Sequence, residues 1–222
     1  MPLDGAGHGR AAESEGGLSG MPAVWERIVE RLHTQLDRVS HASGRRQTRQ
    51  RAMRRGAPRR VVVVCYGNIC RSPYAAAALR RRLAIAGAPS IQIESAGLFG
   101  AGRPANRQAA AAAGHRAISL AGHQSRLFRQ SDSEGDSLIL VMTRSQKREL
   151  IREFAVESGR IELLGDFDTE DPPYREILDP YGKSDEEFDR VFSQIDRSVD
   201  GLVQVWRSQG APQGGPESSI GQ

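Results

Sequence analysis

The fold is decided by the stretch Val61-Val62-Val63-Val64-Cys65-Tyr66-Gly67-Asn68-Ile69-Cys70-Arg71-Ser72-Pro73. Its run of β-branched residues is typical of a strand that is buried on both faces of a parallel sheet. Pro73 suits the first turn of a helix, where the missing N–H would have no partner in any case. The stretch therefore predicts a strand over Val61–Cys65, a short loop, and a helix over Ser72–Ala86.

Downstream of this junction, strand patterns alternate with helix patterns. Short apolar runs predict three further strands, over Ile91–Ser95, Ser137–Met142 and Arg160–Leu164. Further helices are predicted over Pro104–Ala113, over Arg144–Phe154, and from a capping box at Ser184 to about Trp206. This alternation predicts an α/β fold, with a four-stranded parallel sheet flanked by helices on both faces.

Length and composition exclude several classes of protein. The chain has 222 residues, 38% of them hydrophobic, which is enough for one domain and some further chain. Its apolar runs are far shorter than the roughly 18 residues that cross a membrane, and no secretory signal is visible, so we expect a cytoplasmic protein without a membrane span. The two cysteines are too few for a disulfide framework or a zinc site, which favours a chemical role and predicts neither metal nor cofactor.

Charge is distributed unevenly along the chain. The formal net charge is +4, but Arg45–Arg60 alone holds eight arginines and no acid. We interpret residues 1–59 as an N-terminal extension, mostly disordered, with a helix over 21–39 and an arginine-rich connector over 45–60. A folded domain over 60–207 and a disordered tail over 208–222 follow. The connector is interpreted as a linker, with contact to a polyanion as the alternative.

The loop between the first strand and its helix has the chemistry of a phosphate-binding loop. Unpaired backbone N–H groups at a helix N-terminus attract a dianion. Gly67 and Asn68 tolerate the left-handed backbone that turns such groups inward, and Arg71 can clamp two phosphate oxygens. The same positive field favours the thiolate form of Cys65, to which Ser72 can donate a hydrogen bond. These features predict a nucleophile directed at phosphorus.

Such a reaction also needs an acid for the departing oxygen. Asp179 is the strongest candidate, because its Pro- and Gly-bounded loop comes just before the last helix and such loops gather at the carboxyl ends of the strands. Tyr181 can stack on an aromatic substrate. Phe99 is expected to supply a further wall, and Tyr66 to narrow the mouth of the pocket.

Several motifs together resemble the low-molecular-weight protein tyrosine phosphatases of bacterial type, over about Arg60 to Arg207. They are Cys65 to Pro73, Ser95-Ala96-Gly97, His123 with Ser125-Arg126, Leu138 to Met142, and Asp179-Pro180-Tyr181. The resemblance implies that Cys65 is a nucleophile that forms a phosphocysteine, that Arg71 binds the phosphate and the transition state, and that Asp179 acts first as acid and then as base.

The resemblance also assigns supporting roles. Substrate or phosphate is expected to contact Tyr66, Gly67, Asn68, Ile69, Cys70, Ser72, Phe99 and Tyr181. A network of Asn68, Ser95 and His123 is expected to hold the loop in shape. Oxidation could pair Cys65 with Cys70, which would shield the nucleophile reversibly.

The leading interpretation is hydrolysis of phosphotyrosine in a protein substrate, for which a bacterial tyrosine kinase is a candidate. Phosphoarginine hydrolysis is an alternative, although relatives with that activity carry threonine where Ile69 stands. Arsenate reduction would need resolving cysteines beyond Cys70. A non-catalytic phosphate-binding adaptor that uses its basic arm is the alternative from another class. The acidic residues of 166–171 are interpreted as a solvated loop rather than a metal site.

Overall fold

The structure is a computed structural model, and it describes residues 41–87, 91–172 and 174–208. The chain divides into two compact units, Met1–Val39 and Ser40–Gln222, and the described residues belong to the second. The helix predicted over 21–39 and the disorder predicted at both ends of the chain lie outside the described residues, apart from the first residue of the tail. Among the described residues, no helix combines the length and the apolar character that a membrane crossing requires.

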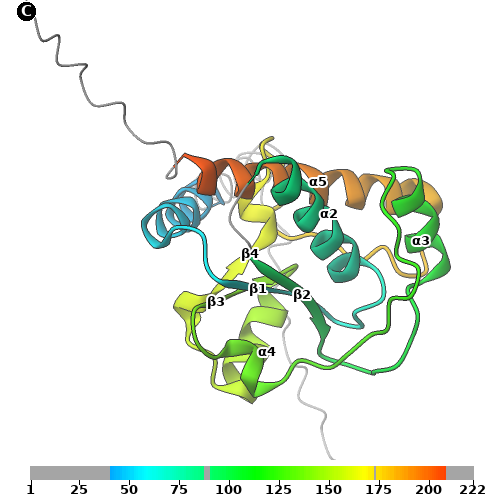
Figure 1. Ribbon diagram of the computed structural model, residues 1–222, viewed down its shortest axis with the longest axis horizontal. Coiled ribbons are helices and arrows are strands. Elements are labelled where there is room, and N and C mark those ends of the chain that lie inside the picture. Colours follow the sequence, from blue (N-terminus) through cyan, green and yellow to red (C-terminus); the bar gives the residue numbers. More distant parts are fainter. Residues whose placement is uncertain (1–40, 88–90, 173, 209–222) are drawn as a thin grey trace, which may run out of the picture. The chain divides into compact units, whose positions relative to one another are not determined.

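A four-stranded sheet forms the centre of the molecule (Figure 1). The strands are β1 (Arg60–Cys65), β2 (Gln92–Gly97), β3 (Ser137–Val141) and β4 (Ile161–Leu163). All pairs are parallel, and the order is β2-β1-β3-β4. The predicted four-stranded parallel sheet is therefore confirmed. Because β1 lies between two neighbours, the chain leaves it in the middle of the carboxyl edge of the sheet.

The valine run of β1 supplies both halves of the core. Val61, Val63 and Cys65 belong to one hydrophobic cluster, and Val62 and Val64 belong to the other. The first cluster is completed by α2 (Arg71–Ile85), α3 (Arg107–Gly114) and α5 (Asp185–Arg207), and the second by α4 (Arg144–Phe154). Figure 1 shows α4 on one face of the sheet and the other helices on the opposite face. Short 3₁₀ helices, η1 (Gln130–Ser133), η2 (Ser158–Arg160) and η3 (Leu164–Phe167), join the later elements.

One helix start and one helix cap differ from the sequence-based expectation. The predicted start of α3 at Pro104 is wrong, because Asn106 caps the helix by accepting hydrogen bonds from the amides of Gln108 and Ala109 at 2.9 and 3.1 Å. The predicted capping box at Ser184 is also wrong. Ser184 is the N-cap of α5, but its side chain makes no capping bond, and Glu187 pairs with Arg190 instead.

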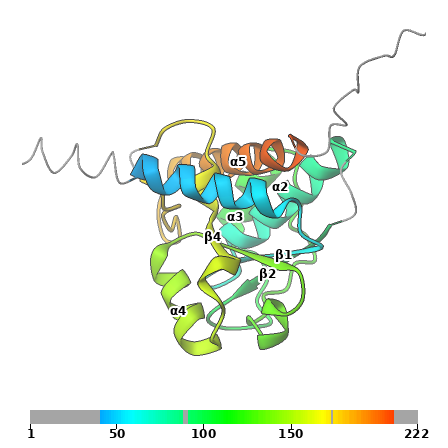
Figure 2. The same cartoon turned by 90° about the vertical axis from the view of Figure 1, so that its left-hand side faces the viewer.

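The largest correction concerns the arginine-rich connector. Residues 41–55 form a helix that lies beside α5 (Figure 2). Arg45, Thr48 and Ala52 are buried at the three- and four-residue spacing of one helix face. Two of these three residues are polar, and they bind acidic residues in and after η3, Arg45 to Asp171 and Thr48 to Asp166. The interpretation of residues 45–55 as a linker outside the domain is therefore wrong.

Candidate active site

The loop between β1 and α2 holds the predicted nucleophile against the start of the helix. Cys65 is the last residue of β1, and Ser72 is the second residue of α2. Both are buried, and Cys65 Sγ lies 3.0 Å from Ser72 Oγ. A hydroxyl at this distance can donate to a thiolate, which is the protonation state in which cysteine attacks.

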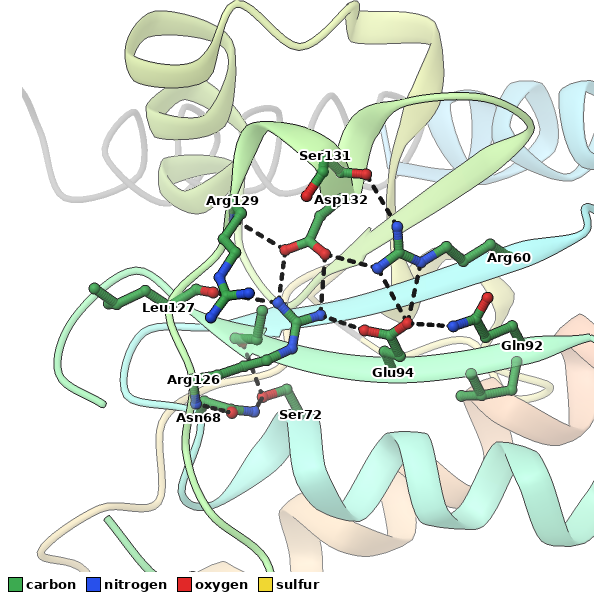
Figure 3. Close-up of polar contacts among 12 residues, drawn as sticks. Arg60, Asn68, Ser72, Gln92, Glu94, Arg126, Leu127, Arg129, Ser131 and Asp132 are labelled. Carbon is green, nitrogen blue, oxygen red and sulfur yellow. Dashed lines mark hydrogen bonds and ion pairs between the residues drawn. The ribbon is translucent and has the colours of Figure 1, made fainter. Parts of the chain in front are cut away.

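Asn68 organises the loop from within (Figure 3). It is fully buried and adopts a left-handed backbone with φ of 51°. Its Oδ1 accepts the backbone N–H of Arg126 at 3.0 Å, which leaves Nδ2 to donate to Ser72 Oγ at 2.9 Å. The ring Nε2 of His123 lies 2.7 Å from the Asn68 carbonyl oxygen. Ser72 Oγ accepts from Asn68, and its own proton has two acceptors within reach, the Cys65 sulfur at 3.0 Å and the Ala96 carbonyl at the longer distance of 3.4 Å. The shorter contact favours donation to Cys65.

A ring of four charged side chains stabilises the segment around Arg126, whose backbone N–H binds the Asn68 side chain. The Arg126 guanidinium contacts Glu94 and Asp132, and the Arg60 guanidinium contacts the same two carboxylates, at 2.7 to 3.0 Å (Figure 3). Burial alone would raise the pKa of Asp132, but hydrogen bonds from Arg126 and from the Arg129 amide, with the charge of Arg60, lower it. Asp132 is therefore held as a carboxylate.

Arg71 and Asp179 approach each other from different elements. The Arg71 side chain is almost fully buried, and its Nη1 donates to the Ile177 carbonyl at 3.0 Å. Its Nη2 pairs with Asp179 Oδ2, while Asp179 Oδ1 accepts the amide of Tyr181 at 3.2 Å. The Nε of Arg71 is buried and has no hydrogen-bond partner among the described residues. The guanidinium thus retains a donor for an anion that enters the site.

These groups surround a pocket of about 260 Å³ at the carboxyl edge of the sheet. Its lining residues are Cys65, Tyr66, Gly67, Ile69, Cys70, Arg71, Phe99, Arg103, Asp179 and Tyr181. The rings of Tyr66 and Phe99 stack at 5.6 Å between centroids, and both are more than half exposed. Exposed aromatic rings above a buried thiol and guanidinium suit a phosphate ester of an aromatic alcohol.

The second cysteine is chemically different from a reactive thiol. Burial, with smaller contributions from Cys65 and Asp179, raises the pKa of Cys70 to about 12 against the opposing charges of Arg71 and Arg103. Both cysteines are free. Cys70 is consequently a neutral thiol at physiological pH.

The structure brings most predicted site residues together and separates one. Ser95 lies two residues before Gly97 in β2 and pairs with Val63, whereas the loop begins level with Gly97. Two residues of strand are about 6.6 Å, and among the described hydrogen bonds none joins the Ser95 side chain to the loop. Asn68 Nδ2 bonds to Ser72 instead, and the expected part of Ser95 in the network with Asn68 and His123 stays a prediction.

Sequence reasoning missed Arg103. Its Nη2 donates to the carbonyls of Gly67 and Phe99 at 3.0 and 2.8 Å, and its guanidinium lies 5.8 Å from the Phe99 ring centroid. A Cβ on Gly100 would lie 2.7 Å from the same Nη2, so this glycine leaves room for the guanidinium. Gly100 and Gly102, which both precede the arginine, were the available signal.

The comparisons with known proteins agree with this geometry. A family model described as low molecular weight phosphotyrosine protein phosphatase matches residues 60–211. This chain belongs to that family. The match covers the sheet and the pocket, and it leaves the helix over residues 41–55 outside.

Named relatives are enzymes of this class. The probable low molecular weight protein-tyrosine-phosphatase EpsP of Ralstonia nicotianae is 34% identical over 151 residues, which are 68% of this chain and 97% of EpsP. The tyrosine phosphatase AmsI of Erwinia amylovora is 30% identical with a TM-score of 0.60, over 67% of this chain and 93% of AmsI. The arginine phosphatase YwlE of Geobacillus stearothermophilus is 27% identical with a TM-score of 0.60, over 68% and 95% of the two chains. This chain is an enzyme of the protein-tyrosine-phosphatase type.

Proposed function

We propose that this phosphatase hydrolyses phosphotyrosine through a phosphocysteine on Cys65. The observation that carries the proposal is the convergence of Cys65, Arg71 and Asp179 on one pocket, with Cys65 Sγ 3.0 Å from Ser72 Oγ. The first step forms the bond between Sγ and phosphorus and breaks the bond between phosphorus and the tyrosine oxygen. The loop amides and the fork of Arg71 stabilise the charge that spreads over the equatorial oxygens.

Asp179 supplies the proton in this step. In the empty pocket its carboxylate pairs with Arg71, and a phosphate dianion offers the guanidinium a stronger partner. Once Arg71 turns to the phosphate, Asp179 is free to hold a proton and to donate it to the departing tyrosine oxygen. In the second step Asp179 takes a proton from water, the water oxygen bonds to phosphorus, and the sulfur leaves as thiolate.

The aromatic walls favour phosphotyrosine over phosphoarginine. Tyr66, Phe99 and Tyr181 line the pocket with exposed rings, and Ile69 places an apolar side chain beside them. A phenyl ring gains from stacking between such walls, whereas a guanidinium leaving group needs polar partners. Turnover of matched phosphotyrosine and phosphoarginine peptides tests this preference, and faster release of phosphate from phosphoarginine would contradict it.

The broader setting is proposed on the same basis. A tyrosine-phosphorylated protein in the cytoplasm, for which a bacterial tyrosine kinase is the candidate, would present such a side chain. Contact of the N-terminal arginines with a polyanion is a further proposal. Because Arg45, Arg49 and Arg51 make internal hydrogen bonds, the polyanion proposal rests on the exposed arginines 46, 54, 55 and 59.

Replacing Cys65 by serine tests the nucleophile. Cys65→Ser should release no phosphate from an aryl phosphate, because a serine hydroxyl at this site is a far weaker nucleophile than a thiolate. The variant should still be stabilised against thermal unfolding by inorganic phosphate, since Arg71 and the loop amides remain. Full activity of Cys65→Ser would refute the proposal, and loss of phosphate binding would show that the loop itself had been disrupted.

A further inference from the structure

The helix over residues 41–55 contacts the domain through polar groups that lead toward the active site. Thr48 is fully buried, and its Oγ1 donates to Asp166 Oδ2 at 2.7 Å. Arg49 Nε donates to the backbone carbonyl of Asp166 at 3.1 Å. A buried hydroxyl aimed at a carboxylate makes a charge-assisted hydrogen bond, which fixes geometry more strictly than apolar packing does.

Asp166 links this helix to the loop that carries the acid. Its carboxylate, 1% exposed, also receives two hydrogen bonds from Arg175, from Nε at 2.6 Å and from Nη2 at 2.5 Å. Asp166 Oδ2 therefore receives hydrogen bonds from both Thr48 and Arg175. The sequence-based interpretation of residues 166–171 as a solvated loop is wrong at Asp166, and also at Asp168, which is fully buried and pairs with Arg197.

Arg175 is confined on both sides by glycines. A Cβ on Gly44, in the helix, would lie 2.2 Å from Arg175 Nη1, and a Cβ on Gly165 would lie 2.2 Å from the Arg175 carbonyl oxygen. Both the guanidinium and the backbone of Arg175 thus have their positions set by close approach. The helix and η3 together fix the position of Arg175, and with it the start of the segment that leads to Asp179.

The backbone continues directly from Arg175 into the site. The amide of Ile177 donates to the Met142 carbonyl at 2.9 Å, and the Ile177 carbonyl accepts from Arg71 Nη1 at 3.0 Å. Asp179 follows two residues later and pairs with the same guanidinium. Asp179 is thus only four residues further along the chain than Arg175, which pairs with Asp166.

We propose that Thr48 is a positioning residue for the acid Asp179 and acts through Asp166 and Arg175. The helix over 41–55 lies outside the segment matched by the family, and through Thr48 it then contributes to the geometry of the active site. The inference rests on the proposed role of Asp179. Without the Thr48 hydroxyl, Arg175 and the loop behind it sample more positions, and protonation of the leaving oxygen becomes less efficient.

Leaving-group dependence distinguishes this role from a merely structural one. Phenyl phosphate needs the acid because phenolate is a poor leaving group, whereas p-nitrophenyl phosphate needs it much less. We expect Thr48→Val to lower kcat/KM for phenyl phosphate by about three- to tenfold and that for p-nitrophenyl phosphate by less than about twofold. Thr48→Ser, which keeps the hydroxyl, should restore both. Gln47→Val places the same side chain at an exposed position of this helix and should change neither.

A double-variant cycle tests the route of the effect. Asp179→Ala alone should show the leaving-group dependence in a stronger form, and adding Thr48→Val should then change it no further. Equal losses on both substrates, or an undiminished Thr48→Val effect in Asp179→Ala, would overturn the positioning role while leaving Asp179 as the acid. Absence of leaving-group dependence in Asp179→Ala would overturn the role of Asp179 and the inference with it. Arg175→Lys, which loses the two-pronged bond, repeats the test if Thr48→Val yields little folded protein.

Discussion

The guanidinium of Arg71 pairs with the carboxylate of Asp179, joining the first turn of α2 to the loop before α5. The proposed phosphate binder and the proposed acid are thus partners before substrate arrives. An incoming phosphate competes with Asp179 for this guanidinium, because the Nη2 that pairs with Asp179 is also part of the fork that clamps phosphate oxygens. Entry of the dianion and release of Asp179 for proton transfer are consequently linked.

Removing the acid should change how activity depends on pH. A general acid acts in its protonated form, so the basic limb of a pH–rate profile reports the loss of that proton from the enzyme–substrate complex. Asp179→Ala should lower kcat on phenyl phosphate by about a hundredfold or more and should lose this basic limb. The measurement is kcat against pH. Glu153→Ala, which removes an exposed carboxylate of α4, is the control and should keep the wild-type profile.

Cys70 should resist alkylation in the native protein. Burial raises its pKa from 9.0 to about 12, which lowers its thiolate fraction at pH 7 by about a thousandfold. We expect iodoacetamide at pH 7 to modify Cys65 and to leave Cys70 intact, as read from peptide masses. Unfolded protein, in which both thiols are exposed, should be labelled twice. Modification of native Cys70 at the rate of a free thiol would contradict this prediction.

The junction of β1 and α2 could be predicted because each of its parts leaves a local pattern. Four valines indicate a buried strand, Gly67 and Asn68 indicate an unusual backbone, and Pro73 indicates a helix start. Asn68 does adopt a positive φ. The order of the remaining elements followed from short apolar runs that the sheet and helices bury.

The helix over residues 41–55 was missed for a physical reason. Amphipathic helices are recognised by apolar residues on one face, and here that face contains Arg45 and Thr48. The cost of burying these polar groups is offset by hydrogen bonds to carboxylates more than 110 residues away, such as Asp166. No local sequence pattern reveals such partners. Arg103 escaped notice for a related reason, since apart from the two glycines before it one arginine among many carries no signal until its partners are known.

Two substitutions at Asn68 separate its backbone role from its hydrogen bonds. Asn68→Gly keeps the left-handed backbone at no steric cost but loses the bonds to Ser72 and from Arg126. We expect the inhibition constant of inorganic phosphate to rise about tenfold, the equivalent of about 1.4 kcal/mol. Asn68→Ala should cost about 1 kcal/mol more in the free energy of unfolding, because alanine is strained at φ of 51°. Equal stability of the two variants would contradict the strain argument.

Arg103 should affect the aromatic part of the substrate more than the phosphate. Its guanidinium holds the Gly67 and Phe99 carbonyls together and faces the Phe99 ring. Arg103→Lys keeps the charge but loses the planar fork. We expect KM for phenyl phosphate to rise about three- to fivefold with kcat nearly unchanged, and the inhibition constant of inorganic phosphate to stay within about twofold. A similar rise in both constants would show that Arg103 acts chiefly on the phosphate.

The charged ring behind Asn68 should make stability depend on pH. The folded-state pKa of Asp132 lies below its ordinary value of 3.8, so the pair with Arg126 contributes stability fully above that value and loses it as pH falls through the folded pKa. Asp132→Asn should therefore lower the free energy of unfolding at pH 7 by about 2 to 4 kcal/mol, because the half-buried guanidinium groups of Arg60 and Arg126 then share the carboxylate of Glu94 in place of two carboxylates. The deficit relative to wild type should shrink as pH falls below 3.8, which urea titrations at several pH values measure.

Asp136→Asn, at an exposed carboxylate that accepts the Arg59 amide, is the matched control for Asp132→Asn. A deficit for Asp132→Asn that stays constant down to the acid-unfolding range would show that Asp132 contributes through shape rather than charge.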